Sequence, residues 1–391
     1  MRIVIITNMP SPYRVPLFNA LNTECRAKGW ILKIIFITRS YTRRHWDVIE
    51  NDFEFDYVYL RDRKFVFGEA LFSFSFSLFQ RLMLESPDII ITGGFSVSTL
   101  WANLYGRLFK KPYIVWTGET IDENKLRKKF RPIRSMVRSF LMRQAHGFVV
   151  YGSAAKKYLV TSRVPEFKIF VARNTVDTEF YMKESARVRL RRNDYINNHK
   201  LPAGLNILYI GQLEKRKGVD LMLNAIRRLQ EKKSALNFAT HIIGSGSCEN
   251  ELQSLVSEAR IRNVYFWGFK QKMEIAEFLG VSDLLVFPSM SELYGLVPIE
   301  AMACGVPVIC SSRAGVTEDL ITDGANGLLV DPANEVDLCS RIEQLIENKD
   351  LRLRLGTAAG KTIMENFLIK HSIKGFIDAI QFTVKTIESL R

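Results

Sequence analysis

The chain has 391 residues, of which 47% are hydrophobic and 25% charged, and its formal net charge is +14 at pH 7. This length suits two domains of roughly 100 to 200 residues, and the composition excludes a disordered or fibrous protein. The positive charge belongs to the N-terminal half, with +16 over residues 1–200 and −6 over residues 201–350. A basic half is compatible with nucleic acid, anionic lipid or an anionic substrate, and composition does not choose among them.

Cysteine usage and the apolar runs give an expected compartment. The five cysteines are scattered and form no CxxC pair, which favours a reducing environment over a disulfide framework. The run Ile3–Ile6 is too short for a signal peptide. The longest apolar stretch, 71–84, is interrupted by polar residues and is shorter than the roughly 17 to 25 residues that span a bilayer. We therefore expect a cytoplasmic protein without a transmembrane helix, with peripheral attachment to the inner face of the membrane as an option.

The N-terminal half alternates short apolar runs with helical patterns. This rhythm of strand, helix and strand is typical of a parallel, doubly wound sheet. The expected strands are 3–7, 31–38, 89–92, 113–116 and 149–150, and the expected helices are 15–28 and a segment ending near 109.

A polar, Arg- and Asn-rich stretch separates this half from a second α/β series. The second series has expected strands at 206–210, 240–243, 264–266, 284–287 and 308–310. We predict a first domain over 1–176, a junction over 177–204, a second domain over 205–369, and a C-terminal helix over 370–391 that crosses back to the first domain. The expected fold class is α/β, with two Rossmann-like, doubly wound parallel-sheet domains that face a cleft.

The most informative segment follows the apolar run 284–287 and carries Glu292 and Glu300. Pro298 suits the first turn of a helix, so the turn before it presents backbone N–H groups that bind a diphosphate. Eight helical residues would span about 12 Å, which lets the two glutamates contact opposite ends of an extended ligand. The alternative is that both are ordinary solvated charges near a helix N-terminus.

Two further glycine turns follow predicted strands of the second series. Residues 211–218 form a basic turn bounded by Gly211 and Gly218, and Gly244 lies in the turn after 240–243. Parallel strands place such turns at one edge of a sheet, where open α/β sheets bind ligands. The basic run at 215–217 suits a diphosphate, although a charged run taken alone is more often an exposed turn.

Together these segments resemble the family 4 (group 1) retaining glycosyltransferases of GT-B fold. The resemblance rests on four ordered matches: Glu292 and Glu300 separated by seven residues, Ala301–Val308 after them, the pattern GxLxxxKG at 211–218, and Asn174-Thr-Val-Asp177. It implies a hexosyltransferase-like enzyme that takes a nucleotide-diphosphate sugar as substrate, needs no cofactor and retains the anomeric configuration.

The resemblance also implies a role for each matching residue. Lys217 and Arg216 hold the diphosphate, Glu292 contacts the transferred sugar and Glu300 binds the ribose hydroxyls. The amides of Gly295 and Leu296 complete the phosphate site, and Gly211, Gly218 and Gly244 shape the donor-binding turns. The N-terminal half departs from the family after its first strand and after Trp116, so Arg14 and Glu119 are candidates for the acceptor side.

The chain has no DxD motif, which favours metal-independent transfer with Arg216 and Lys217 neutralising the leaving group. The alternatives on the same fold are a nucleotide-sugar epimerase or a phosphorylase, and a non-catalytic protein that binds nucleotide sugars. A dehydrogenase is disfavoured because no GxGxxG follows the first strand. Nucleic acid is not an expected partner, since the basic half contains no recognised readout module.

Residues 125–143 carry eight Lys or Arg and no Asp or Glu. Leu126, Phe130, Ile133, Val137 and Phe140 recur at helical spacing, with Pro132 as a break or a helix start. One interpretation is an amphipathic helix with a solvated basic face. The other is a surface that binds anionic lipid, helped by the Phe-rich run 65–79, and presents the protein to a lipid-linked or polysaccharide acceptor of surface glycan (polysaccharide or lipopolysaccharide) biosynthesis.

Overall fold

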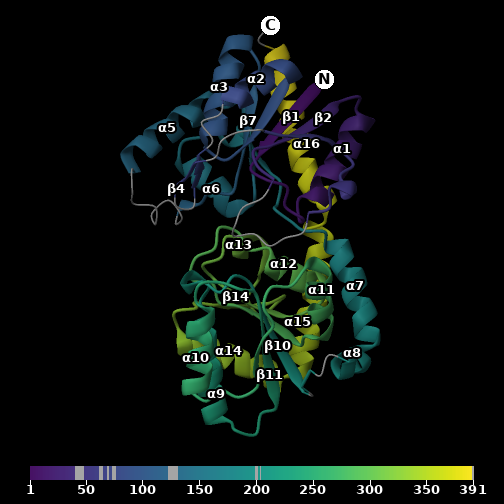
Figure 1. Ribbon diagram of the computed structural model, residues 1–391, viewed down its shortest axis with the longest axis vertical. Helices are drawn as coiled ribbons and strands as arrows, with labels where there is room; N and C mark the ends of the chain where they lie inside the picture. The colour runs from purple at the N-terminus through teal and green to yellow at the C-terminus, as the bar shows by residue number, and fades with distance from the viewer. Residues whose placement is uncertain are drawn as a thin grey trace. The chain divides into compact units, whose positions relative to one another are not determined.

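A computed structural model describes residues 1–39, 48–60, 65–67, 70–72, 76–121, 131–198, 201–202 and 204–389. The chain folds into two compact units, each an α/β body built on a parallel sheet (Figure 1). Unit 1 comprises Met1–Asn174 and Ile369–Arg391, and unit 2 comprises Thr175–Leu368. The predicted fold class, with two parallel-sheet α/β domains, is confirmed.

The unit 1 sheet has seven strands in the order β3-β2-β1-β6-β7-β8-β9, and every neighbouring pair is parallel. Its central strands are buried on both faces, which explains why they appear in the sequence as continuous apolar runs. The strands are β1 Arg2–Thr7, β2 Ile31–Phe36, β3 Asp56–Tyr59, β6 Ile89–Gly93, β7 Tyr113–Thr117, β8 Gly147–Val150 and β9 Ile169–Val171.

Helices cover both faces of this sheet. Ile3 and Ile5 pack with α1 and α16, whereas Val4 and Ile6 pack with α2, α3, α5 and α6, because successive strand residues point to opposite faces. The helices are α1 Val15–Ala27, α2 Phe76–Glu85, α3 Val97–Phe109, α5 Arg131–Gln144, α6 Ser153–Thr161 and α16 Ile369–Glu388, with 3-10 turns η1 Glu50–Asp52 and η2 Glu166–Lys168. A separate antiparallel hairpin joins β4 Phe65–Phe67 to β5 Ala70–Phe72.

The C-terminal helix α16 completes unit 1. Phe376 and Ile380 are buried against the sheet, and Gly375 lies so close to the Val171 carbonyl that a Cβ there would overlap it. The Ser372 hydroxyl donates a hydrogen bond to the carbonyl of Arg173. Among the helices that the structure describes, none is both long and apolar enough to cross a lipid bilayer.

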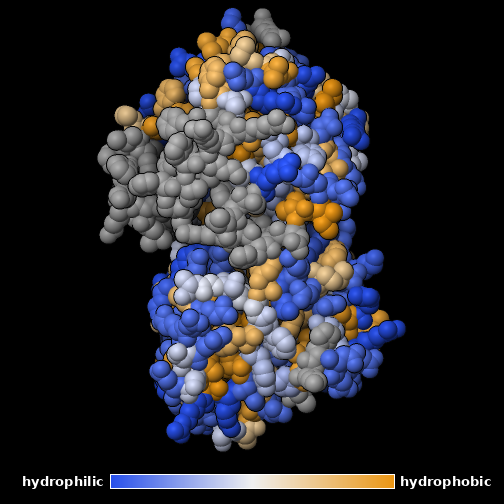
Figure 2. All heavy atoms as spheres, viewed as in Figure 1, coloured by the Kyte–Doolittle hydropathy of each residue, from blue (hydrophilic) through white to orange (hydrophobic). Residues whose placement is uncertain are grey.

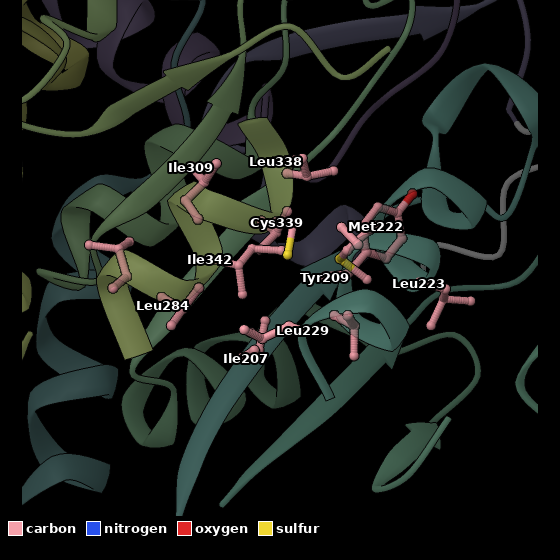
Figure 3. Close-up of a cluster of buried hydrophobic side chains, with 14 of the residues drawn as sticks. Ile207, Tyr209, Met222, Leu223, Leu229, Leu284, Ile309, Leu338, Cys339 and Ile342 are labelled. Atoms are coloured by element: carbon pink, nitrogen blue, oxygen red, sulfur yellow. The ribbon is translucent and has the colours of Figure 1, made fainter. Parts of the chain in front are cut away.

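The unit 2 sheet has six parallel strands in the order β12-β11-β10-β13-β14-β15. Figure 3 shows side chains of helices α9 and α14 packed around Ile207, Leu284 and Ile309 of the sheet. The strands are β10 Leu205–Ile210, β11 Phe238–Ile243, β12 Val264–Phe266, β13 Leu284–Phe287, β14 Val308–Ser311 and β15 Leu328–Val330. The helices are α7 Thr178–Leu190, α8 Arg192–Asn198, α9 Val219–Lys232, α10 Glu249–Glu258, α11 Lys272–Val281, α12 Val297–Ala303, α13 Thr317–Leu320, α14 Glu335–Glu347 and α15 Lys349–Asn366, with the 3-10 turn η3 Lys215–Lys217.

The stretch 177–204, which the sequence analysis treats as a junction, contributes α7 and α8 to unit 2. Val188 of α7 packs on Gly280 of α11, where a Cβ would lie only 2.8 Å from the Val188 Cβ. Arg192 donates to the Asp283 carboxylate at 2.8 Å and to the Val281 carbonyl at 3.0 Å. These contacts explain why so polar a segment is part of a packed body.

Candidate functional site

The predicted donor-side residues lie at the carboxyl ends of neighbouring strands in unit 2. Gly211 follows β10, Gly244 follows β11 and Glu292 follows β13. Within the sheet, β11 and β12 lie on one side of β10, and β13, β14 and β15, which follow in the sequence, lie on its other side. The strand order therefore reverses between β10 and β13, and open α/β sheets bind their ligands at such a point.

Glycines let the turns at this edge approach one another closely. Gly218 has φ +67°, and a Cβ there would collide with the Pro288 carbonyl oxygen after β13. Gly244 has φ +137°, and a Cβ there would collide with the Gly211 carbonyl oxygen after β10. Backbone is thus packed directly on backbone at these strand ends.

Lys217 and Glu292 form an ion pair at this edge, although they lie 75 residues apart in the sequence. Their side chains are only 11% and 16% exposed. Burial lowers the pKa of the Lys217 ammonium, while Glu292 opposes that effect. The backbone fixes the pair, because the amide of Met290 donates to the Arg216 carbonyl at 2.9 Å. The edge therefore holds one shielded cation and one shielded carboxylate side by side.

The three adjacent cations of the basic turn have different surroundings. Lys215 is 69% exposed and pairs with Asp220 at 3.0 Å and Glu251 at 3.4 Å. The Arg216 side chain is 44% exposed and pairs with Glu214 at 2.8 Å. Of the three, only Lys217 is largely shielded from solvent, beside Glu292, so the expectation of an exposed charged turn holds for Lys215 and not for Lys217.

The segment from Glu292 to Glu300 is not one continuous helix, although the estimated distance between the two glutamates assumed that it is. Glu292 lies in the loop before α12 and forms an isolated bridge with Ala314, whereas the helix starts only at Val297, with Pro298 in its first turn. The 12 Å helical spacing is therefore wrong for Glu292. Gly295, at φ +99°, and Leu296 lie in the turn between them. In the described part of the chain, no backbone carbonyl accepts a hydrogen bond from the N–H of Gly295 or Leu296, so both remain available as donors.

Glu300 lies on α12 and is 9% exposed. Burial raises the pKa of its carboxyl to about 7, although a hydrogen bond from the Tyr181 phenol opposes that effect. Burial and the neighbouring Glu300 hold the pKa of Tyr181 well above its ordinary value. Tyr181 belongs to α7 and was not predicted as a site residue. The Asn174-Thr-Val-Asp177 match, four residues upstream, was the only signal that this segment approaches the site.

His241 of β11 lies in the core below this edge. The Trp267 Nε1–H donates to its Nδ1 at 3.0 Å, so its Nε2 carries the proton toward the Asn206 amide oxygen at 2.9 Å. Burial lowers the His241 pKa to about 4. This histidine is neutral and fully hydrogen-bonded, which makes it a structural residue and not a general base.

The acceptor-side candidates belong to unit 1. Arg14 is the residue that precedes α1, and its guanidinium donates to Thr7 Oγ1 at 2.9 Å and to the Tyr151 hydroxyl at 2.8 Å. Glu119 follows β7 and pairs with Arg138 of α5 at 3.0 Å. Arg14 contacts the end of β1 through Thr7, and Glu119 follows β7, so both candidates lie at carboxyl ends of unit 1 strands. The basic residues 125–130 lie outside the described residues, as does part of the Phe-rich run.

A search of the described residues finds no group of three or more His, Cys, Asp or Glu side chains placed to hold a metal ion. The five cysteines are unpaired, and four of them are buried.

Two family models match this chain. Residues 192–362 match the model of glycosyl transferases group 1, and residues 25–180 match that of glycosyltransferase family 4. An uncharacterised glycosyltransferase of Methanocaldococcus jannaschii is 33% identical over 168 residues, which are 43% of this chain and 45% of that protein. The chain thus spans less than half the length of the first curated relatives it matches.

Solved structures share the fold. Anabaena HepE in complex with UDP superposes with a TM-score of 0.75 at 15% identity, covering 97% of this chain and 100% of that one. The lipopolysaccharide outer core galactosyltransferase WaaB, in its apo form, gives a TM-score of 0.70 at 20% identity, covering 97% and 99%. At these identities the likeness establishes the architecture, and the predicted GT-B type is confirmed.

Proposed function

The chain belongs to the group 1, family 4 glycosyltransferases, and from that premise we propose that it transfers a sugar from a nucleotide-diphosphate donor to an acceptor, with retention of anomeric configuration. The observation that carries the proposal is the partly buried pair of Lys217 and Glu292 at the point where the strand order of unit 2 reverses. A shielded cation beside a shielded carboxylate suits a ligand that combines phosphate with sugar hydroxyls.

The donor diphosphate is the leaving group, so the enzyme must stabilise the charge that develops when the bond from the anomeric carbon to phosphate oxygen breaks. Lys217 supplies a cation whose burial strengthens its field. The free N–H groups of Gly295 and Leu296 add two preorganised donors, and Arg216 adds a second cation at the rim.

The two glutamates have different tasks in this proposal. Glu292 accepts hydrogen bonds from hydroxyls of the transferred sugar, next to the reacting carbon. Glu300, buried beside Tyr181, accepts hydrogen bonds from the ribose hydroxyls. Donor binding then replaces the ion pair of Lys217 and Glu292 by two new sets of contacts, because phosphate competes for the ammonium and hydroxyls compete for the carboxylate.

We further propose that transfer needs no metal ion. The support is the missing DxD motif in the sequence and the presence of Lys217, Arg216 and free backbone donors where a metal would otherwise neutralise the diphosphate. No cofactor is assigned, since the nucleotide sugar is a substrate.

The proposed acceptor is a lipid-linked or polysaccharide intermediate of surface glycan biosynthesis, met at the cytoplasmic face of a membrane. The structurally similar WaaB is a lipopolysaccharide outer core galactosyltransferase, which supports this class of acceptor. Exposed apolar side chains gather on α2 and α3 of unit 1, and Figure 2 shows hydrophobic surface in that region. They are Phe76, Met83, Leu84, Leu100, Leu104, Leu108 and Phe109.

Vesicle sedimentation tests this attachment. Binding is expected to require anionic lipid and to weaken with salt, because polybasic segments gain about 1 kcal/mol per Lys or Arg near such a surface. It should fall when Arg127, Lys128, Lys129 and Arg131 are neutralised, and fall separately in Leu108→Glu. Equal binding to neutral vesicles, or none at low salt, would refute the membrane proposal and leave the transferase proposal standing.

A thermal-shift panel of UDP, GDP, ADP and CMP tests the donor site. A ligand at 100 times its Kd stabilises the protein by about 2.7 kcal/mol. One nucleotide is expected to raise the Tm of the wild type and not that of Lys217→Ala. The matching nucleotide sugars are then assayed for transfer and hydrolysis, which distinguishes a transferase from an epimerase and from a non-catalytic binding protein. No response to any nucleotide would refute the proposed function.

A further inference from the structure

Arg14 of unit 1 is a cation whose described partners are all uncharged. Its guanidinium donates to the Thr7 and Tyr151 hydroxyls and lies 4.5 Å from the centre of the Trp116 ring. Thr7 and Trp116 are 3% and 2% exposed. The Nε atom of Arg14 is buried and, in the described part of the chain, has no hydrogen-bond partner. The Tyr13 side chain is a third hydrogen-bonding partner of Arg14. A guanidinium has five N–H groups, so donors remain, and the Nε–H is among them.

Three other shielded cations of unit 1 are neutralised by carboxylates. Lys33 and Arg81 both pair with Glu85, and Arg138 pairs with Glu119 at 3.0 Å. Arg14 forms no ion pair with any described carboxylate. A shielded charge without a counter-ion is unfavourable, and ring contacts and neutral hydroxyls only partly compensate for it. Arg14 therefore has the surroundings of a binding group and not those of a structural ion pair.

The surroundings of Arg14 are rigid. The Tyr151 ring packs edge-on against Trp116 with centroids 5.6 Å apart. It also lies against Gly118, where any Cβ would collide with it. The Tyr151 hydroxyl, which accepts a hydrogen bond from the guanidinium, is therefore held in place by Gly118 at the neighbouring strand end. Preorganised groups of this kind lose little entropy when a ligand binds.

The site lies where a ligand is expected. Thr7 ends β1, Gly118 follows β7 and Tyr151 follows β8, so three strand ends contribute to it. Helix α1 starts at Val15, directly after Arg14, and its first turn contains no acidic residue. The positive end of that helix adds to the charge of the guanidinium.

We propose that Arg14 and its neighbours form a subsite for an oxyanion, a phosphate or a carboxylate, carried by the acceptor. A planar guanidinium binds either group through two parallel N–H donors. The identification of the anion with the acceptor rests on the proposed function, whereas the anion site itself does not.

The test is a thermal-shift titration of the full chain with potassium phosphate, potassium glucuronate and potassium chloride at matched ionic strength. Because phosphate can also bind beside Lys217, every protein carries Lys217→Ala. Phosphate or glucuronate is expected to raise the Tm above the chloride value, and Arg14→Met should weaken that response on the order of 10- to 100-fold in apparent Kd. Arg107→Met, which removes an exposed arginine of α3, is the matched control and should respond fully.

The responses to phosphate and to glucuronate distinguish an acceptor that carries a phosphate from one that carries a carboxylate. A response to phosphate alone assigns a phosphorylated acceptor, and a response to glucuronate alone assigns a uronic acid. Without added anion, Arg14→Met should unfold at the same temperature or higher, because it removes an uncompensated charge. As a second measurement, the NMR signal of the Arg14 Nε–H, identified by its loss in Arg14→Met, should shift on adding the anion.

A lower Tm of Arg14→Met in chloride, with no anion response in the parent protein, would show that Arg14 only fastens α1 to the sheet and would overturn the proposal. An equal anion response in parent and Arg14→Met would also overturn it. UDP binding, measured with Lys217 restored, reports on the proposed function separately, so either proposal can fail alone.

Discussion

Replacing Glu300 by Gln tests the link between burial and donor binding in unit 2. Glutamine has nearly the shape of the protonated glutamate but cannot ionise. The pKa of the Glu300 carboxyl is raised from 4.5 to about 7 by burial. Each pKa unit corresponds to 1.36 kcal/mol, so a shift of this size is worth about 3 kcal/mol of unfolding free energy.

The sign follows from which state binds the proton more tightly. The folded protein does, so the contribution of Glu300 is complete below pH 4.5 and is lost as the pH rises through 7. Glu300→Gln does not lose stability in this way as the pH rises, because glutamine does not ionise. Its stability relative to the wild type should therefore increase by about 3 kcal/mol between pH 4.5 and 7 and then level off.

The assay is urea unfolding of both proteins in parallel from pH 5 to pH 8. Only the difference between the proteins is interpreted, because His241, with its pKa lowered to about 4, destabilises both as the pH falls below 6.5. If the two proteins keep a constant difference across this range, the carboxyl does not carry the raised pKa and the argument is refuted.

The same variant should bind UDP more weakly. Glutamine keeps only one acceptor oxygen, so one hydrogen bond to the carboxylate is lost and the other loses its charge assistance, which reduces affinity on the order of 10- to 100-fold. A protein that is more stable at pH 8 yet binds its nucleotide less well is the expected result. Unchanged UDP affinity in Glu300→Gln would remove Glu300 from the proposed ribose contacts.

Three other predictions concern the same edge of the sheet. Lys217→Ala and Glu292→Gln should each lower kcat by about 10² to 10³ while leaving the protein folded, since one preorganised charge is removed; turnover close to wild type in both would contradict the site. Transfer should persist in excess EDTA, and complete loss that Mg²⁺ or Mn²⁺ restores would mean that the diphosphate site is misplaced. Gly218→Ala should lower the Tm and abolish UDP binding, because its Cβ meets the Pro288 carbonyl, whereas Gly324→Ala has a similar φ of +71° with open space and should keep UDP binding. Equal effects of the two alanines would show that φ strain alone matters.

Most strands that the sequence predicted are buried on both faces, although the partly exposed edge strand β12 was predicted as well. β1, β7 and β13 are continuous apolar runs bounded by polar residues, so their pattern was sufficient. β3, with the sequence Asp-Tyr-Val-Tyr, lies at a sheet edge and is only partly buried, and β15 has just three residues. An edge strand needs fewer apolar residues, which is why β3 gave no recognisable pattern, whereas β15 is apolar but too short to be recognised.

For the candidate site, sequence analysis predicted residue types at strand ends but not their pairing. The order of the strands was not predicted, and it is this order that brings Lys217 to Glu292. Tyr181 was missed because an aromatic residue on an amphipathic helix looks like any core residue. Its contact with Glu300 arises from the packing of α7 on α12, which no local pattern encodes.

Unit 1 can complete its folding only after helix α16 has been translated, because α16 belongs to it although unit 2 comes between them in the sequence. Residues 1–174 leave the ribosome first, yet the sheet face that α16 covers stays open until residues 369–389 have been made. Unit 2, a continuous segment, is complete before then. During synthesis the nascent first body therefore lacks the cover that α16 gives to β8, β9 and Trp116 for the whole time that the second body is made, a period of about 10 to 40 seconds at 5 to 20 residues per second. A premature stop codon after residue 368 would thus damage the body that residues 1–174 build.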